Sequence, residues 1–216
     1  MTRVVRTGGR LAFVIAAIFS VLIALVSYRF LPLGVESAME FMAHHLAERS
    51  LALYAHIGVA PVALALMPFQ FVSGLRSRRP ALHRWLGRFY VSAVLVSGVA
   101  GIQLAFYTAA GSFAATGFAL LAVIWLATTG AAFYFAMTRQ FDRHRDWMLR
   151  SAALTFAAVT LRIYLAIAMV ADIDFDVAYP LISWLAWVPN ALVVEAWLRR
   201  KRAPSRRSSS TEPRTA

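Results

Sequence analysis

Six long runs of apolar residues, separated by short polar segments, constrain the fold of this chain more than any other feature of its sequence. Each run has about 20 residues, which as an α-helix suffices to cross a hydrocarbon layer of about 30 Å. The runs are continuous rather than alternating, and lipid satisfies no backbone hydrogen bond, so helices are favoured over the strands of a barrel. The predicted spans are residues 11–31, 51–74, 85–107, 113–137, 147–170 and 179–198.

The pattern predicts an all-α polytopic membrane protein with six transmembrane helices. We expect spans two to five to form a central four-helix bundle, with spans one and six alongside. A basic lead, residues 1–10, precedes the first span, and a basic tail, residues 199–216, is rich in Ser, Arg and Pro and expected to be disordered. The first run could instead be a cleaved signal peptide, but its length and the lack of a small-residue cleavage site favour a retained span.

The distribution of charge predicts the orientation of the spans. The net charge of +12 would suit nucleic acid, but almost all charges lie in the gaps between the apolar runs, so no nucleic-acid partner is expected. With the N-terminus, the turns after spans two and four and the tail on one side, that side holds 17 of the 22 basic residues. Basic loops stay in the cytoplasm, so both termini are predicted to be cytoplasmic. There the basic loops and the tail should attract anionic lipid headgroups.

Two basic turns hold the candidate cofactor-binding residues. These are His83, Arg84 and Arg88 in the turn of residues 74–88, and His144 and Arg150 in and just after the turn of residues 138–147. Two imidazoles on neighbouring helices can hold haem b, with the arginines available for its propionates, and the protein would then carry electrons. Alternatively, both histidines are ordinary interfacial residues beside Trp85 and Trp147 at the membrane surface.

Polar residues inside the spans form a second group of candidates, for a ligand pocket. They are His56, Gln70, Gln103, Thr155 and Arg162. An unpaired charge in the membrane costs about 2.5–3.5 kcal/mol on insertion scales, which makes Arg162 the strongest single signal. Arg162 and His56 are expected at similar depth in the outer third of the membrane, where with Gln103 they could line a pocket for a small anionic or lipid-like ligand. Alternatively, Arg162 reaches the outer headgroups or pairs with Asp172 or Asp174.

Catalytic and metal-binding templates are missing from the sequence. It contains no H-E-x-x-H, no phosphate-binding G-x-x-x-x-G-K-S/T, no G-x-S-x-G pattern and no cysteine. The adjacent pair His44 and His45 could bind a metal, but a solvated pair in a loop is the simpler interpretation, and we predict no metal site. No catalytic residue is assigned. A membrane oxidoreductase component, a ligand-binding or transport protein and a scaffold for a protein partner all stay open.

Three segments carry a resemblance to a known family. They are residues 68–71 (PFQF), 83–90 (HRWLGRFY) and 144–155 (HRDWMLRSAALT), the last continuing to Leu161 and Arg162. They resemble the bacterial membrane-protein family called domain of unknown function 2306, over about half of the chain, from His56 to Arg162. The resemblance implies a multi-span protein of the bacterial inner membrane and no particular activity. The layout is also similar to cytochrome b561-type bundles, in which imidazoles on spans three and five share a haem, although span four here has no histidine.

Overall fold

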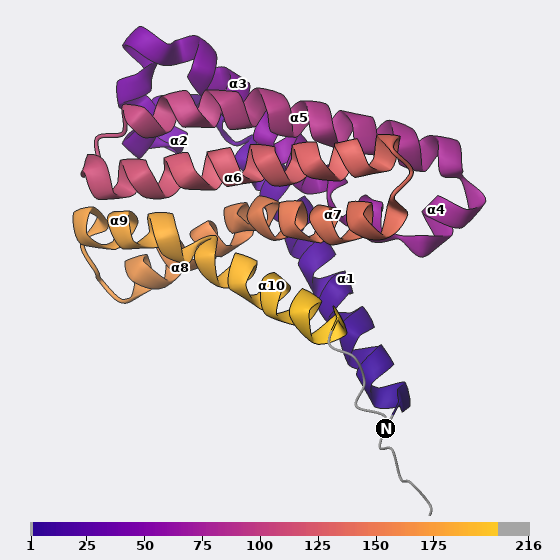
Figure 1. Ribbon diagram of the computed structural model, residues 1–216. Helices are drawn as coiled ribbons and strands as arrows, with labels where there is room; N and C mark the ends of the chain where they lie inside the picture. Colours follow the sequence, from indigo (N-terminus) through magenta and orange to yellow (C-terminus); the bar gives the residue numbers. More distant parts are fainter. Residues whose placement is uncertain (1, 203–216) are drawn as a thin grey trace, which may run out of the picture.

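The computed structural model describes residues 2–202, with side chains from residue 9 onward, and this part of the chain contains helices and no strand (Figure 1). Six helical passages within it are long and apolar enough to cross a membrane, which confirms the all-α, six-span class. The first passage is α1 (Thr2–Ser27), and the second consists of η1 (Glu40–His45), α3 (Leu46–Leu66) and η2 (Pro68–Phe71). The third is α5 (Pro80–Phe106) and the fourth is α6 (Gly111–Met137). The fifth consists of α7 (Phe141–Thr155) and α8 (Ala157–Val170), and the sixth of α9 (Phe175–Leu185) and α10 (Val188–Arg202). Two short helices, α2 (Phe30–Ala38) and α4 (Ser73–Arg78), lie in the connections.

Neighbouring passages pack side by side in the order of the chain. α3 packs on α5, α5 on α6 and α6 on α7, while α9 lies against α6 and α8, α10 against α7, and α1 against α3 (Figure 1). Small residues permit close approach between these helices, since a Cβ on Gly98 of α5 would lie 2.8 Å from the side chain of Leu126 on α6. The largest buried core contains Leu64, Tyr90, Val94, Trp125 and Leu154. The second to fifth passages therefore form the centre of the molecule.

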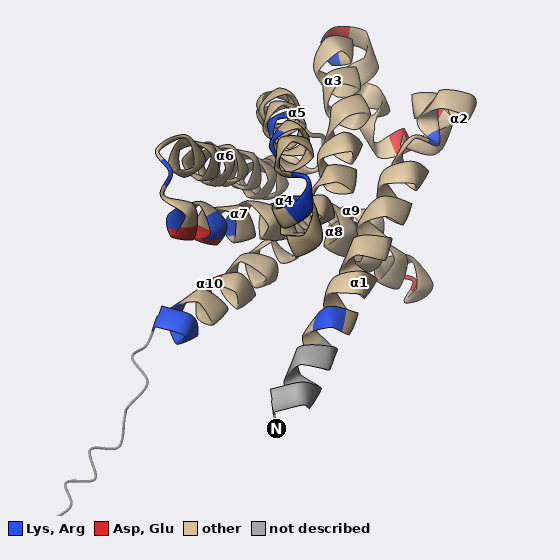
Figure 2. Ribbon diagram, turned by 90° about the vertical axis from the view of Figure 1, so that its right-hand side faces the viewer, with Lys and Arg blue, Asp and Glu red and all other residues tan. Residues whose placement is uncertain are grey.

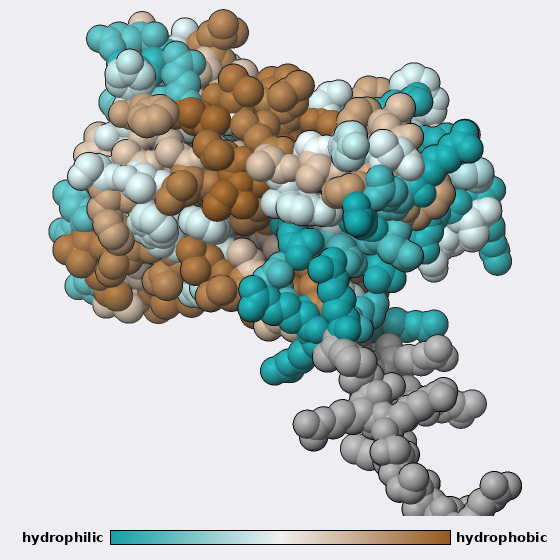
Figure 3. Space-filling view, viewed as in Figure 1, coloured by the Kyte–Doolittle hydropathy of each residue, from teal (hydrophilic) through white to brown (hydrophobic). Residues whose placement is uncertain are grey.

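The two ends of the molecule differ in charge. Figure 2 shows Lys and Arg gathered on α4, the starts of α5 and α7, and the end of α10, and we call this the arginine-rich end. The described ends of the chain, in α1 and α10, also lie there (Figure 1). The acidic residues before α9 and around α2 and the start of α3 lie at the opposite end. Between the two ends, one face carries mostly hydrophobic residues (Figure 3), as expected of a protein surrounded by lipid.

Two of the passages are broken in the middle. The fifth changes from α7 to α8 at Phe156, and the sixth changes from α9 to α10. Pro189 accounts for the second break, because proline has no N–H to donate and its ring clashes with the preceding turn. Near the first break, Thr155 Oγ1 donates to the Ser151 carbonyl at 2.9 Å. Such a bond from a hydroxyl to the preceding turn bends a helix.

Asn190 on α10 connects the two breaks. Its Nδ2 lies 3.3 Å from the Ala153 carbonyl and 2.9 Å from Thr160 Oγ1, on either side of the first break. The same nitrogen lies 3.0 Å from the Ala186 carbonyl, at the second break. Lipid offers no donor for a carbonyl left free by a broken helix, so one amide supplies both breaks with a partner.

Candidate functional site

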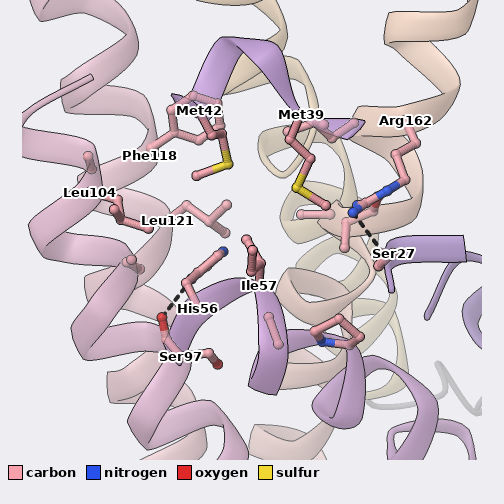
Figure 4. A pocket seen from close by; sticks show the side chains of 18 of the residues that line it. Ser27, Met39, Met42, His56, Ile57, Ser97, Leu104, Phe118, Leu121 and Arg162 are labelled. Atoms are coloured by element: carbon pink, nitrogen blue, oxygen red, sulfur yellow. Dashed lines mark hydrogen bonds between the residues drawn. The ribbon is translucent and has the colours of Figure 1, made fainter. Parts of the chain in front are cut away.

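A cavity of about 280 Å³ lies among the helices near the opposite end (Figure 4). α3, α5, α6 and α8 form its walls, and residues 39–45, which contain η1 and which we call the η1 cap, cover it. Most of the lining is apolar, and its titratable members are Arg29, His44, His45, His56, Arg162 and Tyr179. Within the described part of the chain no Asp or Glu lines the cavity. A cavity lined by basic groups without carboxylates attracts anions.

Arg162 enters the cavity from α8 (Figure 4). Its Nη1 donates to the Ala158 carbonyl at 2.8 Å and its Nη2 to Ser27 Oγ at 2.9 Å. Among residues 9–202 no carboxylate lies within ion-pair distance of its guanidinium, so neither Asp172 nor Asp174 neutralises it. The strongest polar signal in the sequence therefore has only neutral partners in the fold.

The connection after α1 brings a second guanidinium to the cavity. Arg29 donates from Nε and Nη2 to the Ala38 carbonyl at 3.1 and 2.7 Å. The neighbouring Tyr28 donates from its hydroxyl to the Gly58 carbonyl of α3 at 2.8 Å. Tyr28 is thus a neutral donor that fastens the connection to α3, which positions Arg29 beside the cavity.

His56 lines the cavity from α3. Its Nδ1 lies 2.8 Å from the Ser97 carbonyl, and because a carbonyl can only accept, Nδ1 carries the hydrogen of this bond. The other ring nitrogen, Nε2, is turned toward the cavity (Figure 4). Gly101 makes room for the ring, since a Cβ there would lie 3.1 Å from Nδ1. The imidazole is therefore fixed in orientation and offers one nitrogen to an occupant.

The η1 cap contributes a second imidazole. His45 is 2% exposed, and its Nδ1 has no hydrogen-bond partner in the described part of the chain. Its ring lies 3.9 Å from that of His44, whose Nε2 approaches the Tyr107 carbonyl at 3.2 Å. The interpretation of the two histidines as a solvated pair is thus wrong for His45, because the cap folds over the cavity and buries this ring. Met39 and Met42 of the cap also point into the cavity (Figure 4).

Thr155 lines the cavity, but its hydroxyl is already fully used. It accepts from Trp125 Nε1 at 2.9 Å, lies 2.7 Å from the Tyr90 hydroxyl and donates to the Ser151 carbonyl at 2.9 Å. Thr155 therefore belongs to the packing beneath the cavity and has no hydrogen left for a ligand.

The two glutamines among the pocket candidates lie elsewhere. Gln103 is exposed and does not line the cavity. Gln70 is 7% exposed and lies at the arginine-rich end, where a Cβ on Gly87 would come within 3.2 Å of its Oε1. Its Nε2 has no partner in the described residues. The fold thus brings His56, Thr155 and Arg162 together at the cavity and separates both glutamines from them.

The candidate haem ligands lie at the arginine-rich end, on α5 and α7. The Nδ1 of His144 lies 2.8 Å from the Ala132 carbonyl, which leaves Nε2 for another partner. His83 lies within electrostatic range of His144, and its Nδ1 is buried without a partner among the described residues. Neither ring lines the cavity described above.

The arginines expected to bind haem propionates have other roles in the fold. Arg150 donates from Nε and Nη2 to the Glu195 carboxylate at 2.9 and 3.2 Å. Arg88 lies over the Trp85 ring, 5.0 Å from its centroid, and both Arg88 and Arg84 are exposed. The positions of the two histidines are thus compatible with ligation of a haem iron, whereas Arg150 is not free to bind a propionate because it already pairs with Glu195.

Several residues of the site were not found from the sequence. Arg29 lies in the connection after α1 and His45 in the short η1, so no regular helical periodicity points them inward. Tyr179 lies at the start of a predicted span, where aromatic residues are common on any membrane protein. For Arg29 a signal existed, because it is one of only two basic residues expected on its side of the membrane.

The fold and the cavity together define a six-span integral membrane protein with a basic, apolar-walled cavity near one end. A family model described as a predicted membrane protein (DUF2306) matches residues 53–198. The chain belongs to this family, which confirms the resemblance carried by the HRWLGRFY and HRDWMLRSAALT segments. The match includes His56 and Arg162 but not Arg29 or the η1 cap. No curated protein and no solved structure gave a significant match.

Proposed function

We propose that this protein binds a small amphipathic anion in the cavity, within the outer half of a bacterial inner membrane and with the arginine-rich end in the cytoplasm. One observation carries the proposal: two arginines and three histidines line an otherwise largely apolar cavity that has no carboxylate among its described lining residues. A buried guanidinium without a countercharge destabilises the protein by a few kcal/mol, and a bound anion would offset this cost.

The broken fifth passage supports the same proposal. Thr155, Ala157, Ala158 and Arg162, on both sides of the break, line the cavity. Discontinuous helices in membrane proteins are often found where a substrate or ion binds, because the break directs backbone and side-chain groups toward the site.

The test compares decanoate with decanol, a neutral molecule with the same tail, on protein purified into nanodiscs. Decanoate should raise the midpoint of thermal unfolding, since a ligand at 100 times its Kd stabilises by about 2.7 kcal/mol, and decanol should not. Arg162→Gln should abolish the effect. Arg49→Gln is the matched control, because Arg49 pairs with Glu48 at 2.9 Å and does not line the cavity. The proposal would be contradicted if decanoate and decanol raised the unfolding midpoint equally. It would also be contradicted if decanoate raised the midpoints of Arg162→Gln and Arg49→Gln equally.

A second candidate function is binding of haem b by His83 and His144. The observation that favours it is the bond from His144 to the Ala132 carbonyl, which fixes the ring and leaves Nε2 free, as in many ligating histidines. A bound haem would supply one-electron redox chemistry. Purified protein reconstituted with haem should then show a Soret band that His144→Ala and His83→Ala each remove, whereas Arg78→Gln, at an exposed position of α4, should keep it. A wild-type sample without this band would exclude the candidate.

A further inference from the structure

The basic groups of the cavity keep hydrogen-bond capacity for an occupant. A guanidinium has five N–H groups. Arg162 uses Nη1 and Nη2 on the Ala158 carbonyl and Ser27, and Arg29 uses Nε and Nη2 on the Ala38 carbonyl. The remaining N–H groups of two arginines can serve several oxygens of one anion. Guanidinium groups suit phosphate in particular, because their planar fork matches its oxygens.

His56 adds a requirement of the opposite kind. Its Nδ1 holds the hydrogen donated to the Ser97 carbonyl, so in the neutral ring Nε2 is an acceptor that faces the cavity. A protonated His56 would add a third positive charge to a cavity that already holds Arg29 and Arg162 and has no carboxylate in its described lining. This repulsion favours the neutral ring. The occupant therefore needs an O–H or N–H for His56 as well as anionic oxygens for the arginines.

We propose that the anion is a phosphate monoester carried on a single apolar tail, an inference that rests on the proposed function and specifies its ligand. A phosphate monoester has a second pKa of about 6, so at pH 7 roughly a tenth of it is the monoanion, and this form has one P–O–H to donate and other oxygens to accept. A carboxylate can only accept, and a phosphodiester has no P–O–H. Of these three anions, the monoester alone satisfies His56 and both arginines.

The size and lining of the cavity indicate the tail. Apolar side chains surround the polar groups and include Ile57, Leu104, Phe118, Leu121 and Leu161. A cavity volume of about 280 Å³ leaves room for a phosphate and the first carbons of an apolar chain. The rest of a longer tail would continue into the bilayer.

The experiment uses the full chain in nanodiscs of zwitterionic lipid and four probes. These are decyl phosphate, its methyl diester, decanoate and inorganic phosphate, with the Arg162→Gln protein as the background for partition into lipid. Decyl phosphate should bind about tenfold or more tightly than the diester or decanoate, and inorganic phosphate should not bind at millimolar concentration. His56→Leu should lower the affinity for decyl phosphate to that for the diester and change the affinity for the diester by less than twofold.

The possible results separate three statements: that the ligand is a phosphate monoester, that it has an apolar tail, and that the cavity binds an anion. Equal affinities for the three tailed anions overturn the assignment of a phosphate monoester and leave anion binding intact. If inorganic phosphate binds as tightly as decyl phosphate, the statement that the ligand carries an apolar tail is overturned. Binding of no anion overturns the proposed function as well. Because the comparison of probes is made on the wild-type protein, it decides the assignment even where His56→Leu fails to fold.

Discussion

The hydroxyl groups beneath the cavity form a chain in which every hydrogen has an acceptor. Thr129 and Ser151 are 2.6 Å apart, Ser151 and Tyr90 2.6 Å, and Tyr90 and Thr155 2.7 Å. Thr155 gives its hydrogen to the Ser151 carbonyl and accepts from Trp125. One direction satisfies all of them, in which Thr129 donates to Ser151, Ser151 to Tyr90 and Tyr90 to Thr155. This chain joins α5, α6 and α7 in the core.

Tyr90→Phe should lower the free energy of unfolding by about 1–3 kcal/mol, because Ser151 would be left with a buried hydrogen and no acceptor. Tyr90 is fully buried, whereas Tyr134 on α6 is 59% exposed, so Tyr134→Phe is a control with the same chemical change. Thermal unfolding in detergent monitored by circular dichroism measures both. A decrease no larger for Tyr90→Phe than for Tyr134→Phe would show that the chain is not a source of stability.

At the scale of elements, the two broken passages depend on one side chain. Asn190→Leu keeps a similar volume and removes the amide, so the carbonyls of Ala153 and Ala186 lose a partner inside the membrane. We expect a loss of about 1–3 kcal/mol in stability. Leu192→Ala, at a position 64% exposed on the same helix, is the control and should change the midpoint of unfolding little. Equal midpoints for the two variants would mean that a donor other than Asn190, such as a water molecule, already satisfies these carbonyls.

The passages could be predicted from the sequence because crossing lipid depends on length and apolarity, and both are visible in the printed residues. The break at Pro189 also has a local marker. The break at Phe156 has none, since Ser151 and Thr155 occur in unbroken helices as well. Helical phase directs His56 and Arg162 toward other helices, but it does not say which neighbour covers each side chain. For this reason the sequence predicts Gln103 beside His56 and Arg162, whereas the cavity places Arg29 and His45 beside them.

At the scale of the whole molecule, the position of the cavity depends on the orientation of the charged ends. The arginine-rich end carries Arg76, Arg78 and the basic residues that end α10, and the cavity lies near the opposite end. If basic segments stay in the cytoplasm, the cavity receives its ligand from the outer leaflet or from the space outside it. The source of the proposed ligand thus follows from topology rather than from the site.

The natural chain has no cysteine, so single cysteines can report this topology without background. Ala109, in the connection between α5 and α6 at the opposite end, and Ser77, in α4 at the arginine-rich end, are both exposed. In intact spheroplasts a membrane-impermeant maleimide should label Ala109→Cys, while Ser77→Cys should react only after lysis, because the cytoplasm retains the basic turn. The reverse pattern would place the arginine-rich end outside. The cavity would then face the inner leaflet, and its anion would have to come from the cytoplasmic side.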